Sequence, residues 1–258
     1  MFLSWKDEGL AEGPSNGNAH DRRRPEIRND DAAPDARCPP AAHDPSGNGF
    51  SHTGISPEAD GFRAFYRLYA ERSGKSRWGD KTPEYVLHIS DIAETLPEAH
   101  FIHIIRDGRD VGLSLRQCWF APGHHMKGLA DHWQQGVIEG RRQGSGCPHY
   151  IEVRYETLVS RPSAVLGEIC GFLGLPYVSQ LERYHERSMD RLREHGDRRT
   201  RDGMLVVSRE ERLRQQQLVS RPPDPSRIEA WKETMTTDER RDFEEVASEL
   251  LRDLGYEV

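Results

Sequence analysis

The chain has 258 residues, 36 basic and 43 acidic side chains, and a formal net charge of −7. No apolar run approaches the roughly 20 residues that a membrane-spanning helix needs, and the amino-terminal residues lack the basic region and the longer apolar stretch of a secretory signal. Four cysteines without a CxxC pair are too few for a disulfide scaffold in a chain of this length. The near balance of charge gives no broad basic face for nucleic acid. We therefore expect a reduced, cytoplasmic protein with no nucleic-acid partner and no membrane span.

Residues 1–59 are predicted to form an amino-terminal segment that is largely disordered. Residues 11–60 contain only three large apolar side chains but seven of the 16 prolines, and residues 1–60 carry −5 of the net charge. Such a segment buries too little apolar surface to offset the entropy of ordering it. The basic run at 22–24 could bind nucleic acid or a partner, but the surrounding acids favour a solvated tail. One folded domain is therefore predicted for residues 60–258.

Two helices are predicted at the start of this domain. Aromatic residues recur every three or four positions over 62–69, which is typical of an amphipathic helix, with Asp60 as its cap. A second helix is expected to begin with Thr82 as N-cap and Pro83 in its first turn, and to end at Pro97. Its predicted buried face consists of six apolar residues, namely Val86, Leu87, Ile89, Ile92, Ala93 and Leu96.

Two strand–turn–helix units follow, and they define the fold class. Residues 100–105 are apolar and rich in β-branched side chains, a polar turn comes at 106–110, and a helix is expected from Val111 to Trp119. The pattern repeats with a strand at 150–155 and a helix over 165–173. Strand, short turn and helix in this order indicate an α/β fold with a parallel sheet flanked by helices.

The rest of the chain predicts less regular structure before a final helix. A helical stretch is expected over roughly 178–196, followed by a long, polar, Arg-rich loop over 197–227. The chain ends in a helix that is capped near Thr237 and terminated by Gly255. The predicted buried face of this helix consists of Phe243, Val246, Leu250 and Leu251.

The turn after the first predicted strand carries the strongest sequence signal for a binding site. A strand that ends in Arg106 places a guanidinium at the carboxyl edge of the sheet, where open α/β folds bind ligands. Asp107 and Gly108 open the next helix, whose free amides favour an anion, and Ser114 follows about two turns further on. The planar fork of arginine suits phosphate oxygens. An ion pair between Arg106 and Asp110 with a purely structural role explains the same residues equally well, so both interpretations stay open.

Three segments in this order resemble the sulfotransferases that use 3′-phosphoadenosine 5′-phosphosulfate (PAPS). They are GDKTPEYVLHI, FIHIIRDGRDVGLSL, and IEVRYETLV with a later FLGL. The resemblance covers residues 60–258 and is strongest to the branch that contains bacterial, carbohydrate and tyrosylprotein enzymes. It implies a P-loop NTPase-like sulfotransferase fold, and transfer of a sulfuryl group from PAPS to a hydroxyl of a carbohydrate, lipid or small metabolite.

The resemblance also implies roles for five residues. Arg106 and Ser114 match the pair that holds the 3′-phosphate of PAPS, and Tyr155 matches a residue beside the adenine. Lys81 matches a lysine near the transferring sulfuryl group, where a fixed cation offsets the charge that develops on the leaving phosphate. Arg227 could add a third phosphate contact. No metal is expected, because fixed cations and helix dipoles can carry the charge.

Two departures from the family pattern bear on this hypothesis. Pro83 stands where some members have a histidine general base, so the base must lie elsewhere. The Gly-Thr/Ser-rich loop that follows the first strand of the family and cradles the 5′-phosphosulfate has no counterpart in the chain. We therefore expect the domain to lack that loop and its first strand, through a start codon placed too late, a real truncation or degeneration. The abrupt apolar start at residues 1–5 favours the first explanation. The alternative function is binding of adenosine 3′,5′-bisphosphate-type nucleotides without catalysis.

Histidines supply the remaining candidates. His124, His125 and His132 could place two imidazoles together on a helix, but a zinc site needs a third ligand, and a polar surface cluster is the favoured interpretation. His124 or His125 is also a candidate general base, because the loop after the phosphate-binding helix can border the acceptor pocket. His103 lies inside the first strand and is expected to be a hydrogen-bonded core residue.

Overall fold

The computed structural model describes residues 2–6, 57–188 and 192–258. The predicted disorder of the amino-terminal segment and the basic run at 22–24 therefore fall outside the described residues. No helix in the described ranges is long and apolar enough to cross a membrane.

The centre of the fold is a four-stranded sheet in the order β2-β1-β3-β4. The strands span Phe2–Lys6 (β1), Arg77–Asp80 (β2), His100–Ile105 (β3) and Tyr150–Arg154 (β4). β3 and β4 are parallel, whereas β1 is antiparallel to both of its neighbours. The strands predicted at 100–105 and 150–155 are confirmed, and the apolar start of the chain belongs to β1.

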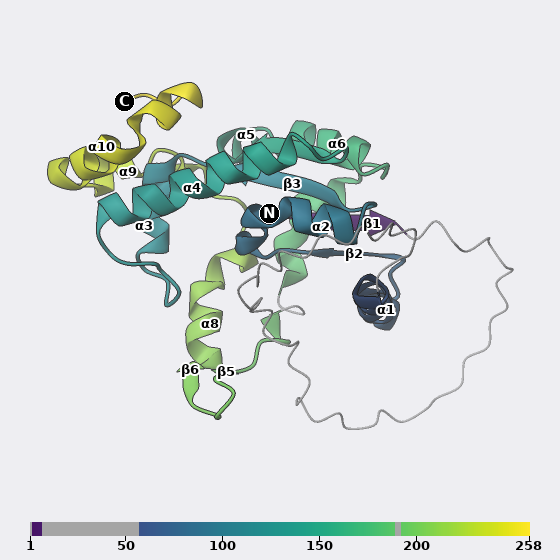
Figure 1. The fold of residues 1–258 in the computed structure, drawn as a ribbon. Coiled ribbons are helices and arrows are strands. Elements are labelled where there is room, and N and C mark those ends of the chain that lie inside the picture. The colour runs from purple at the N-terminus through teal and green to yellow at the C-terminus, as the bar shows by residue number, and fades with distance from the viewer. Residues whose placement is uncertain (1, 7–56, 189–191) are drawn as a thin grey trace, which may run out of the picture.

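Helical segments connect the strands and complete the fold. The α-helices span Pro57–Arg72 (α1), Ile89–Thr95 (α2), Gly108–Leu115 (α3), Met126–Gly144 (α4), Tyr155–Ser160 (α5), Pro162–Phe172 (α6), Arg209–Gln215 (α8), Trp231–Thr234 (α9) and Thr237–Asp253 (α10). The 3-10 helices span Pro83–Leu87 (η1), Ser179–Glu186 (η2), Gln217–Ser220 (η3) and Pro225–Arg227 (η4). A short hairpin of Arg198–Arg199 (β5) and Leu205–Val207 (β6) lies beside α8, away from the main sheet in Figure 1.

Alternating residues of β3 face two helical layers, since neighbouring side chains of a strand point to opposite faces. Ile105 packs in a core with residues of α3, α4 and α10, and Figure 1 shows α4 running along β3. Phe101 packs on the same face with residues of α2. Ile102 points the other way and packs with Val153 and with α6. Helices therefore cover both faces of the sheet, which confirms the predicted α/β class.

The final helix behaves almost as its sequence predicts. Its N-cap is Thr236, one residue before the expected Thr237, and Thr236 forms a reciprocal capping box with Glu239. Gly255 ends the helix with a φ of 78°, a conformation that glycine adopts without steric cost. Phe243 and Leu251 of α10 are fully buried against α3 and α4.

Several predicted elements are wrong in detail. α1 begins at Pro57, so Asp60 is not its cap, and Phe62 and Phe65 are half exposed. The helix predicted from Pro83 is broken at His88, where φ is −133°, into η1 and α2. In the described part of 178–196 the helix is mainly the 3-10 segment η2.

The predicted loop at 197–227 is also wrong, because it contains β5, β6 and α8. Ser208 caps α8 by accepting a hydrogen bond from the Glu211 amide, and the acids Glu210 and Glu211 lie in its first turn. These are ordinary helix-start features, which the high arginine content of the segment obscured.

Candidate functional site

The predicted anion site lies where β3 and β4 end. Ile105, the last residue of β3, is in register with Arg154, the last residue of β4. The residues that follow them, Arg106 and Tyr155, therefore leave the sheet at the same edge. The Arg106 guanidinium carbon lies 4.5 Å from the centre of the Tyr155 ring. The parallel pairing therefore brings together two residues that are 49 positions apart in the sequence.

Arg106 is held by two groups but keeps hydrogen-bonding capacity. Its Nη2 donates to the Arg227 carbonyl oxygen at 2.5 Å and lies 3.2 Å from Oδ2 of Asp110. The side chain is 15% exposed. Its Nε is buried and has no hydrogen-bond partner among the described residues. A buried N–H without a partner is unfavourable, and an anion held by this fork is the kind of ligand that would satisfy it.

The ion pair between Arg106 and Asp110, proposed above as a purely structural alternative, is present. It does not use the whole guanidinium, because Nε remains unpartnered in the described part of the chain. The structural and the ligand-binding interpretations of Arg106 are therefore compatible.

The tight turn after Arg106 depends on Asp107 and Gly108. The Asp107 side chain caps α3 by accepting from the Arg109 amide at 2.9 Å. A Cβ on Gly108 would lie 2.5 Å from the Trp133 ring, so a larger residue does not fit there. Nε1 of the same tryptophan donates to the Arg106 carbonyl oxygen at 3.2 Å. These contacts fix the backbone that presents the Arg106 side chain.

Asp110 anchors a distant loop beside Arg106. Its carboxylate accepts hydrogen bonds from the backbone amides of Glu229 at 3.0 Å and Trp231 at 2.9 Å. Burial raises the pKa of Asp110, although the Arg106 charge and the two amides oppose this effect. Because Asp110 holds residues 229–231, the nearby Arg227 carbonyl reaches Arg106.

The second arginine of the motif has a structural role. Arg109 is 1% exposed and donates through Nε and Nη2 to Asp107 and through Nη1 to Glu244 of α10. Its guanidinium lies 3.6 Å from the centre of the Trp231 ring. The two arginines of RDGRD thus differ. Each guanidinium nitrogen of Arg109 has a hydrogen-bond partner within the fold, whereas Nε of Arg106 has none among the described residues.

The other predicted site residues differ in whether they contact Arg106. Arg227 contacts Arg106 through its backbone carbonyl oxygen, and the expected contact of its side chain with phosphate stays a prediction. Ser114 is exposed on the last turn of α3, and Lys81 is exposed immediately after β2. In the described ranges, no hydrogen bond or ion pair joins the side chain of either residue to Arg106.

A polar cluster supports the backbone before Lys81. Oδ2 of Asp80 accepts hydrogen bonds from the hydroxyls of Tyr85 at 2.7 Å, Tyr66 at 3.2 Å and Thr82 at 3.4 Å. Burial, together with the Asp80 charge, raises the pKa of both tyrosines, so they remain hydrogen-bond donors. The cluster connects α1, β2 and η1 on both sides of Lys81.

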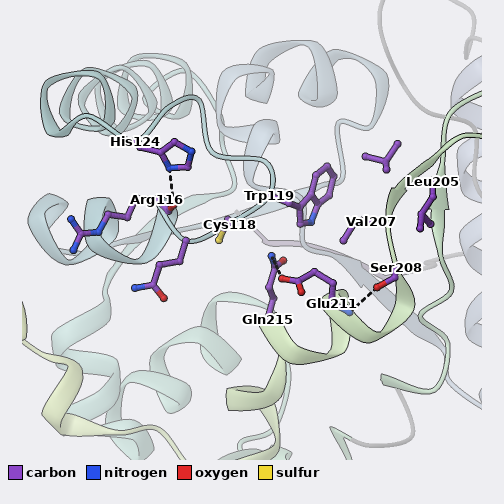
Figure 2. A pocket seen from close by; sticks show the side chains of 11 residues that line it. Arg116, Cys118, Trp119, His124, Leu205, Val207, Ser208, Glu211 and Gln215 are labelled. Carbon is purple, nitrogen blue, oxygen red and sulfur yellow. Dashed lines mark hydrogen bonds between the residues drawn. The ribbon is translucent and has the colours of Figure 1, made fainter.

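A separate pocket of about 420 Å³ lies at the carboxyl end of α3. Figure 2 shows its walls, which come from the residues after α3, from His124, from β6 and from α8. The lining residues are Arg116, Gln117, Cys118, Trp119, His124, Leu205, Val206, Val207, Ser208, Glu211 and Gln215. The last six all lie in the segment at 197–227 that was predicted to be a loop. The apolar run Met-Leu-Val-Val at 204–207 is the sequence signal that could have revealed the β6 wall.

The histidine predictions have different outcomes. His103 is buried, and its Nδ1 is hydrogen bonded to the Tyr150 hydroxyl at 2.7 Å, which confirms the core role. His124 lines the pocket. Within the described ranges no group of three or more His, Cys, Asp or Glu side chains is arranged to hold a metal ion.

Comparison with known proteins identifies the family. Residues 18–180 match the family described as "Sulfotransferase family". Since this match covers more than half of the chain, the protein belongs to the sulfotransferase family. The nodulation protein NoeE of Sinorhizobium fredii (strain NBRC 101917 / NGR234) is 24% identical over an alignment of 217 residues, which covers 75% of this chain and 48% of that protein. The chain thus spans about half the length of this curated relative.

Two solved structures resemble the fold. The sulfotransferase domain of the Synechococcus PCC 7002 olefin synthase has a TM-score of 0.51 and 24% identity, over 79% of this chain and 66% of that one. The sulfotransferase domain from the curacin biosynthetic pathway has a TM-score of 0.43 and 18% identity, over 69% and 62% of the two chains. The first of these supports the sulfotransferase fold that the sequence motifs predicted.

Proposed function

We propose that this chain transfers a sulfuryl group from PAPS to a hydroxyl of a small-molecule, lipid or carbohydrate acceptor. The observation that carries the proposal is the Arg106 guanidinium at the carboxyl edge of the parallel strands, with a buried Nε that has no hydrogen-bond partner in the described part of the chain. This location is where open α/β sheets bind ligands, and a guanidinium fork binds phosphate oxygens well.

In this proposal Arg106 binds the 3′-phosphate and Tyr155 lies beside the adenine. The cation–π contact between them orients the fork before a ligand arrives, which lowers the entropic cost of binding. Ser114 adds a hydroxyl donor from the last turn of α3. Arg227, whose side chain is partly buried near Asp224, is a further candidate contact to phosphate.

Lys81 is proposed to stabilise the leaving group. PAPS, when bound, supplies a sulfuryl group on a phosphate that leaves with increased negative charge. A cation fixed near the bridging oxygen stabilises that charge in the transition state. The hydrogen bonds that Tyr66 and Tyr85 donate to Asp80 restrain the backbone from which the Lys81 side chain extends.

The alternative is a protein that binds adenosine 3′,5′-bisphosphate-type nucleotides without transferring sulfate. The observation in its favour is that the sequence contains no Gly-Thr/Ser-rich phosphosulfate loop. Both functions use the Arg106 site, so an experiment has to separate binding from transfer.

The test combines calorimetry with a transfer assay on the full chain. PAPS with radioactive sulfur is incubated with 2-naphthol, 1-octanol and methyl β-glucoside as acceptors, and labelled product is separated from donor. We expect transfer to at least one acceptor. We expect Lys81→Ala to lower kcat about 100-fold, while its affinity for adenosine 3′,5′-bisphosphate stays within about twofold, because the 3′-phosphate is held elsewhere. Lys75→Ala, which alters another exposed lysine, is the matched control.

Two results would contradict the proposal. Absence of binding of adenosine 3′,5′-bisphosphate would exclude both functions. Binding without transfer to any of the acceptors would replace the transferase with the nucleotide-binding alternative.

A further inference from the structure

The pocket at the end of α3 lies close enough to the Arg106 site to serve the same reaction. α3 has eight residues, so its two ends are about 12 Å apart at 1.5 Å per residue. Arg106 lies two residues before this helix, and Arg116 to Trp119, which follow it, line the pocket. Helix α3 therefore connects the Arg106 site with the pocket.

The pocket exposes apolar side chains that a ligand could cover. Trp119 is 40% exposed, Leu205 53% and Val206 44%, and all three line the same hollow. Exposed apolar side chains that converge on one cavity are typical of small-molecule sites. Figure 2 shows the Trp119 ring between the α3 side and the β6 side of the pocket.

The charged side chains of the lining are already paired. Arg116 pairs with Glu239 at 2.6 Å, and Glu211 pairs with Arg214 at 2.6 Å. Burial raises the pKa of the Cys118 thiol, so the thiol stays neutral. These pairings favour a ligand whose buried part is uncharged and apolar, since such a part requires no counter-ion.

His124 lines this pocket and carries a ring nitrogen that can accept a proton. Its Nδ1 lies 3.0 Å from the Arg116 carbonyl oxygen, drawn as a dashed line in Figure 2. A carbonyl oxygen can only accept a hydrogen bond, so Nδ1 carries the hydrogen and Nε2 carries the lone pair in the neutral ring. A general base needs this tautomer if Nε2 is to receive a proton.

We propose that this pocket binds the sulfuryl acceptor as an uncharged, apolar aryl or alkyl alcohol, and that Nε2 of His124 removes the proton of its hydroxyl. This inference rests on the proposed sulfotransfer. The bond between the acceptor oxygen and sulfur forms while the bond between sulfur and the bridging oxygen of the phosphosulfate donor breaks. The hydroxyl proton moves to Nε2, and the electron pair of the broken bond leaves with the phosphate.

Acceptor binding is tested by calorimetry with 2-naphthol and with methyl β-glucoside, without any nucleotide. We expect the chain to bind 2-naphthol and to show no detectable binding of the glucoside. Trp119→Ala should weaken 2-naphthol binding at least about tenfold, since it removes the aromatic wall. Phe65→Ala, which removes a half-exposed aromatic ring on α1, is the matched control and should bind normally. Equal binding by the Trp119→Ala variant, or a preference for the glucoside, would overturn the assigned acceptor class.

The role of His124 is tested by His124→Gln, with His125→Gln as the adjacent control outside the lining. We expect His124→Gln to lower kcat with 2-naphthol about 100-fold, with 2-naphthol affinity within about twofold. The kcat of the unaltered chain should fall as the pH is lowered, because a protonated imidazole cannot accept a proton, and His124→Gln should abolish this acidic limb. An unchanged kcat in His124→Gln would overturn the base assignment.

Nitrogen NMR of the His124 ring provides a readout that does not need activity. We expect the tautomer with hydrogen on Nδ1, and hydrogen on Nε2 would contradict the assignment. If the unaltered chain binds 2-naphthol through Trp119 but does not bind adenosine 3′,5′-bisphosphate, the proposed sulfotransfer fails and the apolar-alcohol pocket stands.

Discussion

Replacing Arg109 should destabilise the fold far more than replacing an exposed arginine. Arg109 is 1% exposed, and its guanidinium donates at 3.0 and 2.8 Å to Asp107 and at 2.8 Å to Glu244. It also lies over the Trp231 ring. In Arg109→Met the apolar stem is kept, but the buried Asp107 carboxylate loses its counter-ion.

The expected loss follows from the asymmetry of buried ion pairs. Removing one partner of a buried pair costs about 3–5 kcal/mol, because the other charge is left uncompensated. For a folded part of this size, about 4 kcal/mol corresponds to a fall in Tm of about 8–16 °C. The loss should be measured by urea unfolding and by thermal melting, both followed by circular dichroism.

Arg142→Met is the matched control for this measurement. Arg142 is 65% exposed and pairs only with Glu139 on its own helix, among the contacts of the described chain. Its replacement should change the free energy of unfolding by no more than about 0.5 kcal/mol. A loss below about 1 kcal/mol in Arg109→Met would refute the structural role assigned to Arg109.

Two further predictions concern the packing behind the site. Burial lowers the pKa of His103 to about 4 from its ordinary 6.5. As the pH falls, the unfolded chain therefore binds the proton before the folded chain does. The contribution of neutral His103 to stability is complete above pH 6.5 and is lost as the pH falls toward 4. The free energy of unfolding should be measured with urea at pH 7 and at pH 4. Its loss between these pH values should be about 3 kcal/mol smaller in His103→Asn than in the unaltered chain. An identical loss in both proteins would contradict the burial argument. Gly108→Ala should destabilise by about 1–3 kcal/mol, because its Cβ would lie 2.5 Å from the Trp133 ring. The control is Gly128→Ala within α4, where the new Cβ would meet no atom of another described element within 4 Å. This variant should be neutral or stabilising by up to about 1 kcal/mol. Equal thermal melting curves for the two variants would argue against the close approach of Gly108 and Trp133.

Local sequence patterns predicted the elements that local forces decide. The apolar run at 100–105 is β3, and the turn that begins with Asp107 and Gly108 starts α3. A capping residue near Thr237 was also expected, and Thr236 has that role. In each case the decisive interactions lie within a few residues, or are simple burial of one face of the element.

The contacts that the sequence did not predict join residues that are far apart in the chain. Arg109 and Asp110 lie in the most conspicuous motif, but their partners Glu244 and Trp231 are more than 120 positions away, and no spacing rule reveals such a pairing. The backbone contact of Arg227 with Arg106 also depends on Asp110, which anchors the residues that follow Arg227.

The pocket was missed for a related reason. Its β6 and α8 walls lie in a segment whose arginines suggested a polar loop, although the apolar run at 204–207 and the cap at Ser208 were visible in the sequence. The formation of such short elements depends on tertiary packing, which overrides composition.

Recognition of the 3′-phosphate by Arg106 is the central claim, and a selectivity measurement tests it most directly. Calorimetry should compare adenosine 3′,5′-bisphosphate with adenosine 5′-monophosphate for the unaltered chain, for Arg106→Lys and for the control Arg142→Lys. Lysine keeps a cation for Asp110 but loses the fork.

We predict that the unaltered chain and the control bind the bisphosphate about 10- to 100-fold more tightly than the monophosphate, the value expected for charge-assisted hydrogen bonds to one phosphate. Arg106→Lys should lose most of this preference. Equal affinity of the unaltered chain for both nucleotides, or an undiminished preference in Arg106→Lys, would contradict the claim.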